Sequence, residues 1–149
     1  MEEVLYEIGR DDWDRHWDDY SDAASENPAQ AYRSQVCIDL LGLRKAGGEV
    51  RLLDVGSGQG DMAAAVHTVA SSAEILGLEL SESGAEISRK KVPDARFVHR
   101  NLIEQISVPE EQRAWATHAV CSEVIEHVDD PVRLPRAPVN TCNLRRCSW

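Results

Sequence analysis

The sequence of 149 residues predicts an α/β fold, a parallel sheet doubly wound with helices. Three observations support this class. Short apolar runs alternate with stretches of helical periodicity. Apolar residues make up 42% of the chain, enough for the buried core of one domain. A glycine-rich segment follows the first apolar run, as at a ligand-binding turn from strand to helix. In such sheets ligands bind beyond the carboxyl ends of the strands, so we expect functional residues there.

Two helices are predicted before the sheet. Residues 11–26 are polar except for Trp13, Trp17 and Tyr20, whose spacing places the rings on one helical face. This stripe is consistent with a lid over a ligand pocket or with a docking face. Docking is favoured because aromatic residues at helical spacing usually pack against a neighbour.

A second helix is predicted to begin at Asn27-Pro28 and to run to about Leu43. One side of this helix carries apolar side chains, and Gly47-Gly48 is expected to end it. The apolar side consists of Tyr32, Val36, Leu40 and Leu43.

Four strands follow, over residues 50–55, 75–80, 95–99 and 117–121. Helices are predicted over 62–70 and 81–91, with Ser81 or Ser83 as the cap of the second. Strands separated by helices in this rhythm pair in parallel through right-handed crossovers.

The segment Asp54-Val55-Gly56-Ser57-Gly58-Gln59-Gly60-Asp61 follows the first strand. Glycines here let the backbone turn sharply and approach a ligand closely. The dinucleotide fingerprint requires glycine where this chain has Asp61, an acid that would repel a pyrophosphate at a helix start. The phosphate-binding loop fails as well, since its lysine and hydroxyl residue are missing.

The ends of the next two strands complete a predicted adenosine site. Glu79 lies 23 positions after Gly56, close to the spacing at which an acid reaches ribose hydroxyls. Leu80 would lie flat against the base. Asn101, followed by Leu102, could accept a hydrogen bond from the exocyclic amine of adenine.

In combination these motifs resemble the class I S-adenosylmethionine-dependent methyltransferases, which have a Rossmann-like fold. The resemblance covers about residues 13 to 134 and rests on four segments. They are Leu52 to Gly60, Glu79, Asn101-Leu102, and Cys121-Ser122-Glu123-Val124-Ile125-Glu126-His127-Val128.

The resemblance implies roles for individual residues. Cofactor contacts would come from Asp54, Gly56, Ser57, Gly58, Gly60, Glu79, Leu80, Asn101, Leu102, Ser122 and Glu123. Many relatives carry Asp in place of Asn101. Tyr32 and Arg33 are further candidates for contacting the cofactor carboxylate. A sulfonium cofactor without phosphate suits a loop flanked by Asp54 and Asp61.

A metal site is a second interpretation of the segment after the fourth strand. Glu123, Glu126 and His127 would share one face if the segment were helical. Some methyltransferases hold magnesium with a similar segment. We expect no metal here, because three ligands are too few alone.

The end of the chain differs in composition from the rest. Residues 131–149 hold four Arg and no acid, whereas the whole chain has a formal charge of −10. Pro135 and Pro138 would interrupt any helix begun at Asp130-Pro131. Two interpretations compete, a naturally minimal protein and a C-terminally truncated or frame-shifted domain, and the composition favours the second, so that the chain would hold the N-terminal half of the fold. The expected parts are an N-terminal helical segment over 1–48, a partial cofactor-binding domain over 49–134 and an aberrant tail over 135–149.

The predicted function is transfer of a methyl group from S-adenosylmethionine to an unidentified small-molecule acceptor, with no catalytic residue assigned. The alternative is a non-catalytic remnant that binds the cofactor weakly or not at all, and Asp61 disfavours a nicotinamide-dependent dehydrogenase. An isoelectric point near 4.9 argues against nucleic acid or an anionic membrane as partner. Four cysteines without a Cys-x-x-Cys pair, an acidic N-terminus and the lack of a long apolar run predict a cytoplasmic protein with reduced thiols.

Overall fold

The computed structural model describes residues 12–101 and 112–128. Within them a four-stranded parallel sheet has the order β3-β2-β1-β4. The elements are α1 (Trp13–Ser25), α2 (Pro28–Leu40), the 3₁₀ turn η1 (Leu43–Lys45), β1 (Arg51–Val55), α3 (Asp61–Val69), β2 (Glu74–Glu79), α4 (Glu82–Lys91), β3 (Arg96–His99), β4 (His118–Cys121) and the 3₁₀ turn η3 (Ile125–His127). The four predicted strands and the parallel α/β class are confirmed.

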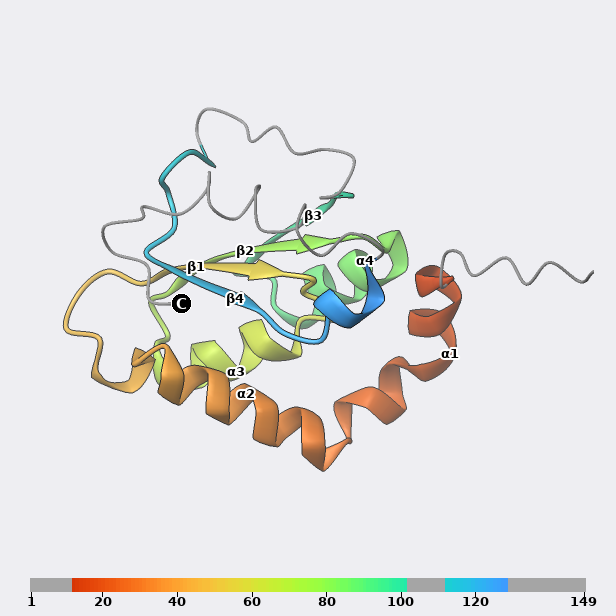
Figure 1. The fold of residues 1–149 in the computed structure, drawn as a ribbon, viewed down its shortest axis with the longest axis horizontal. Helices are drawn as coiled ribbons and strands as arrows, with labels where there is room; N and C mark the ends of the chain where they lie inside the picture. Colours follow the sequence, from red (N-terminus) through yellow and green to blue (C-terminus); the bar gives the residue numbers. More distant parts are fainter. Residues whose placement is uncertain (1–11, 102–111, 129–149) are drawn as a thin grey trace, which may run out of the picture.

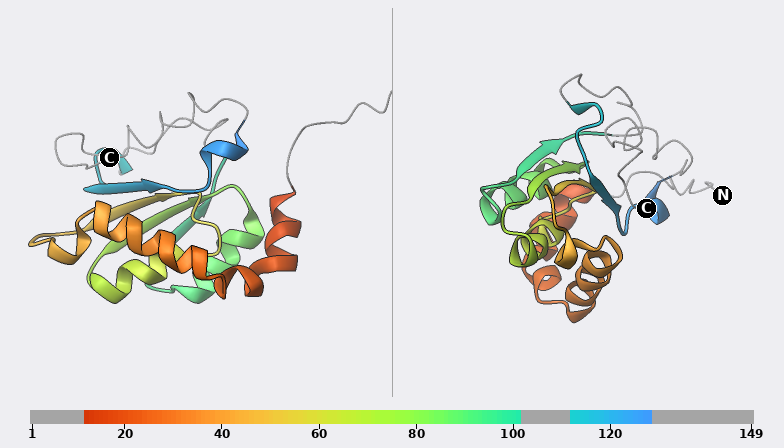
Figure 2. Two further views of the ribbon diagram at one scale, coloured as in Figure 1. Left: turned by 60° about the horizontal axis from the view of Figure 1, so that its bottom comes forward. Right: turned by 90° about the vertical axis from the view of Figure 1, so that its left-hand side faces the viewer.

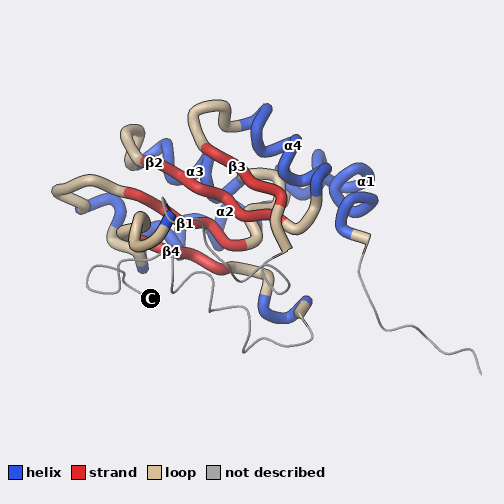
Figure 3. The backbone as a smooth tube through the Cα atoms, turned by 90° about the horizontal axis from the view of Figure 1, so that it is seen from above, coloured by secondary structure: helices blue, strands red, loops and turns tan. Residues whose placement is uncertain are grey.

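The chain builds the sheet outward from β1 through β2 to β3, then returns to place β4 on the other side of β1 (Figure 1). This reversal beside β1 is the switch point of a doubly wound sheet, where a crevice opens at the carboxyl ends of the strands. Helices α2, α3 and α4 cover one face of the sheet (Figures 2 and 3). Helix α1 lies beyond the carboxyl ends of the strands, next to α4 (Figure 1).

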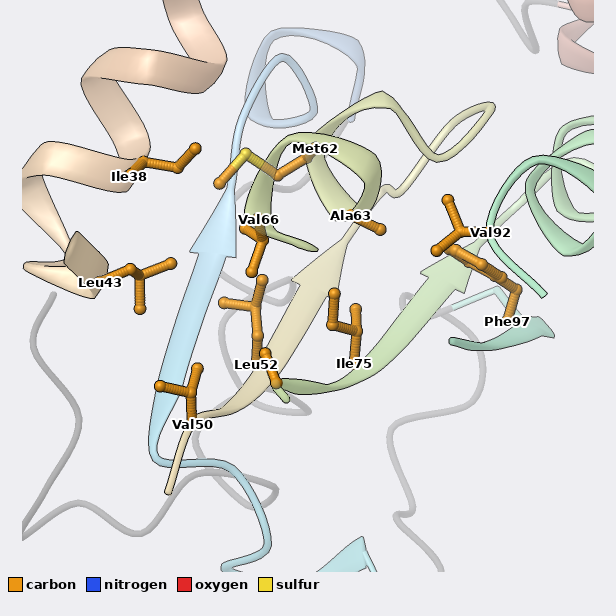
Figure 4. Close-up of a cluster of buried hydrophobic side chains, with 11 residues drawn as sticks. Ile38, Leu43, Val50, Leu52, Met62, Ala63, Val66, Ile75, Val92 and Phe97 are labelled. Atoms are coloured by element: carbon orange, nitrogen blue, oxygen red, sulfur yellow. The ribbon is translucent and has the colours of Figure 1, made fainter. Parts of the chain in front are cut away.

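The core has two parts because both faces of the sheet are apolar. Leu52 and Ile75 point toward the helices, where they pack with Ile38, Met62 and Val66 (Figure 4). On the opposite face a second buried cluster forms. It consists of Leu53, Val55, Leu76, Leu78, Ala116 and Ala119. Successive strand residues point to opposite faces, so the unbroken apolar runs in the sequence reflect burial on both.

The N-terminal caps of α2 and α4 lie where the sequence predicts them, but α2 ends earlier than predicted. The Asn27 side chain accepts a hydrogen bond from the amide of Ala29 at 2.9 Å, and Ser81 rather than Ser83 caps α4. Helix α2 ends at Leu40, earlier than predicted, because Gly42 adopts a left-handed conformation (φ 66°) that begins η1.

Of the four residues predicted as the apolar side of the second helix, Leu43 is buried, but it lies in η1, and the rest of that side does not form the packed face of α2. Ser34 and Ile38 are the buried residues of this helix, whereas Tyr32 and Leu40 are 72% and 79% exposed. Ser34 and Ile38 lie four positions apart, on the same face of the helix.

Within the described residues no helix is both long and apolar enough to cross a bilayer. The predicted division of the chain touches residues that the structure does not describe. Residues 1–11 of the N-terminal segment, residues 102–111 and 129–134 of the partial domain and the tail over 135–149 lie outside the described part.

Candidate cofactor site

The loop between β1 and α3 follows the conformation that its glycines predict. Gly56, Gly58 and Gly60 all have positive φ, at 72°, 52° and 85°. The loop is fastened to β2, since the amides of Gly56 and Ser57 both donate to the Leu78 carbonyl, at 2.8 and 3.2 Å. Three left-handed residues in five positions explain why this turn is rich in glycine.

A cavity of about 310 Å³ opens beside this loop at the carboxyl ends of β1 and β4. Its walls come from α1, α2, the glycine loop and the segment after β4. The lining residues are Trp13, His16, Trp17, Asn27, Gln30, Arg33, Ser34, Cys37, Asp54, Gly56, Ser57, Gly58, Gln59, Asp61, Met62, Ser122, Glu123 and His127.

The cavity is lined by buried polar groups that lack hydrogen-bond partners. Oδ2 of Asp54, Oγ of Ser57, Nε of Arg33 and Nε1 of Trp17 have none within the described part of the chain. Buried polar atoms of folded proteins are almost always paired, so a cluster of unpaired ones marks a place where a ligand is expected. Two of these atoms, on Asp54 and Ser57, can accept hydrogen bonds, and two can only donate.

Asp54 is the most strongly perturbed group of the cavity. Burial raises the pKa of this carboxyl from 3.8 to about 7, and the nearby charge of Glu79 adds to the effect. The side chain is only 4% exposed. A positively charged ligand group at Oδ2 would favour the ionised form, so this position suits a cation.

A basic side chain faces the cavity from α2. Nε of Arg33 lies 3.7 Å from Oε1 of Glu123, and its Nη2 donates to Gln30 at 2.5 Å. Arg33 thus lines the cavity, and its predicted contact with the cofactor carboxylate stays a prediction. Tyr32, the other candidate, is exposed and does not line the cavity.

Asp61 occupies the first position of α3 and also lines the cavity. Its carboxylate accepts from Nζ of Lys91 at 2.7 Å and from Nε2 of Gln59 at 2.8 Å. A carboxylate thus stands at the helix N-terminus, where a dinucleotide site would expose its amides to a pyrophosphate.

The predicted cofactor residues divide into two groups. The structure brings together at the cavity Asp54, Gly56, Ser57, Gly58, Ser122 and Glu123. Gly60, Glu79, Leu80 and Asn101 do not line it. Leu102 lies outside the described residues.

Glu79 is the clearest case of the second group. Its Oε2 accepts from the amide of Gly58 at 2.6 Å and its Oε1 from the amide of Ser81 at 2.9 Å. Burial raises the pKa of this carboxyl, although the backbone hydrogen bonds partly oppose the rise. Leu80, by contrast, is 47% exposed.

The helical interpretation of the segment after β4 is wrong. Only residues Ile125–His127 form a 3₁₀ turn, and Glu123 precedes it with a left-handed φ of 58°. The ring of His127 packs edge-on against Trp13, with centroids 4.9 Å apart. Among the described residues, no three His, Cys, Asp or Glu side chains gather into a group that could hold a metal ion.

Several lining residues escaped the sequence analysis, and most of them come from α1 and α2. Trp13 and Trp17 were recognised as a stripe, which both packs and lines the cavity. His16 gave no signal of its own, but it lies three positions after Trp13 and its ring packs against both tryptophans. His16 lies within the aromatic stripe, on the same helical face, so counting the imidazole among its rings would have found it.

Comparison with known proteins agrees with this geometry. A family model described as a methyltransferase domain matches residues 53–137, and no curated protein matches the chain. A structure described as a candidate S-adenosyl-L-methionine-dependent methyltransferase of Methanococcus maripaludis is 18% identical, with a TM-score of 0.68. The match covers 90% of this chain and 61% of that one.

Two further structures show the range of the fold. The plantazolicin methyltransferase BpumL, in complex with a pentazolic desmethylPZN analog and SAH, is 19% identical. Its TM-score is 0.65, and the match covers 90% of this chain and 49% of BpumL. The [4+2]-cyclase SpnF is 20% identical, with a TM-score of 0.62, over 79% of this chain and 44% of the cyclase.

The chain thus spans between 44% and 61% of the length of these three structures. The shared fold is Rossmann-like. Since the family model covers more than half of the chain, from the end of β1 past β4, the protein belongs to the methyltransferase-domain family.

Proposed function

We propose that the chain binds S-adenosylmethionine at the glycine-loop cavity and transfers its methyl group to a small-molecule acceptor. The observation that carries this proposal is the cluster of buried atoms without hydrogen-bond partners on Asp54, Ser57 and Arg33 around one cavity. Their chemistry matches the amino-acid end of the cofactor, which has an ammonium and a carboxylate group.

The residues present fit this group. Asp54 and Ser57 would accept hydrogen bonds from the ammonium, and Arg33 would donate to the carboxylate. Gly56 and Gly58 supply the positive φ that the loop requires, and the side chains of Val124 and Trp17 fill the space beside them. Ser122 and Glu123 would bound the site from the side of β4, with Arg33 already 3.7 Å from Glu123.

The adenosine end would use residues around the ends of β2 and β3. Glu79 would accept from the ribose hydroxyls, Leu80 would lie against the base and Asn101 would pair with its edge. Gly60 and Leu102 complete the set proposed by resemblance. None of these residues lines the cavity itself, so the proposal requires the site to extend along the sheet edge.

The bound cofactor supplies an electrophilic methyl group on a sulfonium. The protein supplies position: Asp54 and Arg33 fix the two charged groups of the amino-acid end, so the methyl carbon is held in one place. Helix α2 forms one wall of the cavity and limits the access of water from that side. Alignment of a nucleophile with a fixed methyl group in a dry cavity accounts for most of the rate in such displacements.

A nicotinamide cofactor fits less well. Asp61 stands at the N-terminus of α3, the position that holds a pyrophosphate in dinucleotide sites. Its pairing with Lys91 reduces but does not remove that negative charge.

A small molecule is the proposed acceptor, because the chain has a formal charge of −10 and would repel nucleic acid. The fold alone does not choose the reaction, since a cyclase shares it. Methyl transfer is favoured here by the family match together with the groups suited to a zwitterion.

Calorimetry with S-adenosylhomocysteine tests the cofactor. Wild type should bind it, whereas Asp54→Asn and Arg33→Gln should each bind about tenfold to a hundredfold more weakly, the loss expected for a buried charge-assisted contact. Asp18→Asn and Arg44→Gln make the same charge changes at exposed positions and should bind like wild type. NADH serves as the competing ligand. Binding of NADH but not of S-adenosylhomocysteine would overturn the proposal.

Turnover is tested separately, by transfer of labelled methyl groups to a panel of hydroxyl, amine and carbon acceptors. Transfer that is lost in Asp54→Asn supports the enzymatic part of the proposal. Tight binding without transfer to any acceptor would leave a cofactor-binding protein and remove the methyltransferase activity.

A further inference from the structure

The carboxylate of Glu79 is closed off in this structure, although the proposed function requires it for the ribose. The side chain is 6% exposed, and each of its oxygens accepts from a backbone amide. The two donors belong to Gly58 in the glycine loop and Ser81 at the start of α4. A ribose hydroxyl can therefore reach Glu79 only after its surroundings change.

The indole of Trp17 covers the two segments that hold Glu79. A Cβ placed on Gly58 would lie 2.8 Å from Cζ2 of Trp17, and one placed on Gly84 would lie 2.9 Å from its Cδ1. The ring thus sits in the space left by two absent side chains, between the glycine loop and α4. Its Nε1 is buried there without a hydrogen-bond partner, which is a cost in the closed arrangement.

A second contact fastens α1 to α4. Oδ1 of Asp14 accepts from Oγ of Ser81 at 2.6 Å and from the amide of Ser83 at 3.1 Å. Ser81 is the cap of α4 and also donates its amide to Glu79. The Ser81 hydrogen bond, the larger cause, and the Ser83 hydrogen bond hold the pKa of Asp14 below its usual value. The Asp14 end of this contact is exposed to water, whereas Ser81 is buried.

At the start of α1, the ring of Trp13 packs against His127, with centroids 4.9 Å apart. Tyr20, the last ring of the aromatic stripe, is 58% exposed. Residues 26–27 alone separate α1 from α2, and Asn27 is extended, so this short link is a natural hinge. A helix held mainly by two indole rings and one carboxylate can leave as a unit.

We propose that α1 is a displaceable cover over the ribose side of the cofactor site, held shut by Trp17 and Asp14. This inference rests on the proposed function. The cofactor would bind only to molecules in which α1 has opened, so the measured dissociation constant equals the intrinsic one divided by the open fraction. Any change that weakens the cover should therefore tighten binding.

The test compares Asp14→Ala with Asp18→Ala, an exposed position on the same helix with the same charge change. Calorimetry with S-adenosylhomocysteine should show a dissociation constant about three- to tenfold lower for Asp14→Ala than for wild type, as expected for loss of one or two surface hydrogen bonds. Asp18→Ala should match wild type. Weaker binding by Asp14→Ala would overturn the inference, because α1 would then contribute to the bound site.

Hydrogen exchange of the α1 amides gives a second readout that does not depend on affinity. Exchange should be faster in Asp14→Ala than in Asp18→Ala without ligand, and S-adenosylhomocysteine should accelerate it in wild type. Slower hydrogen exchange of the α1 amides on ligand binding would overturn the inference that α1 is a displaceable cover.

The two proposals fail in different ways. If wild type binds S-adenosylhomocysteine but Asp14→Ala and Asp18→Ala bind equally well, the cover is wrong and the proposed function stands. If no variant binds it while Asp14→Ala still loosens α1, the proposed function is wrong instead.

Discussion

The buried carboxyl of Asp54 makes a quantitative prediction about stability and pH. Its pKa rises from 3.8 to about 7 on folding, which corresponds to about 4 kcal/mol between the two protonation states. Because the folded-state pKa is the higher one, the folded protein holds this proton more tightly than the unfolded chain. The stability that this group contributes is complete below pH 3.8 and is lost as the pH rises through about 7.

The substitution Asp54→Asn removes this dependence, since the amide cannot ionise. Between about pH 5 and about pH 8, wild type should lose about 2.5 kcal/mol of unfolding free energy relative to Asp54→Asn. Urea unfolding followed by tryptophan fluorescence at several pH values measures the difference, and groups common to both proteins cancel. Asp18→Asn is the control and should follow wild type. Stability curves that run parallel for wild type and Asp54→Asn would refute the reasoning about Asp54.

The same titration links Asp54 to its proposed ligand. A cationic group at Oδ2 favours the ionised carboxylate, so affinity for S-adenosylhomocysteine should rise about tenfold between about pH 6 and about pH 8. In Asp54→Asn any remaining pH dependence belongs to the ligand and is subtracted. If the affinity of Asp54→Asn for S-adenosylhomocysteine varied with pH as that of wild type does, the placement of the ammonium beside Asp54 would be contradicted.

Three further substitutions test the packing around the site. Gly58→Ala should destabilise the fold by about 1–3 kcal/mol in thermal unfolding, because φ at this position is positive and the new Cβ would meet Trp17. If the same substitution costs less in a Trp17→Ala protein, the Trp17 ring causes part of the loss. Gly77→Ala should cost a similar amount, since its Cβ would lie 2.4 Å from the ring of Phe97, and no loss of stability would mean that the ring moves aside freely. Ser81→Ala should lower stability by about 1 kcal/mol through loss of the α4 cap, and a neutral effect in urea unfolding would argue against that cap.

The sequence sufficed for the strands and the glycine loop because each has a local cause. Leu52 and Leu53 are apolar and face opposite sides, which requires both faces to be covered. Gly56 and Gly58 stand where the chain needs positive φ. These requirements are properties of single positions and their neighbours, so they can be read along the chain.

The failures concern orientation and contacts between distant segments. The spacing of Glu79 from Gly56 predicts proximity, but not that backbone amides of Gly58 and Ser81 take both its oxygens. Helical periodicity in α2 marks Tyr32 and Leu40 as an apolar side, yet the helix packs through Ser34 and Ile38. Packing of the whole sheet decides which face is buried, and a window of one helix does not contain that information.

The fastening of the glycine loop to the neighbouring strand bears on how the protein folds. Two successive amides, of Gly56 and Ser57, donate to the carbonyl of Leu78, more than twenty positions along the chain. The loop therefore lacks these two bonds until β1 and β2 pair in register. A peptide limited to residues 51–69 should leave the loop unstructured, and in the whole chain the ligand-ready turn should form only together with the central strand pair.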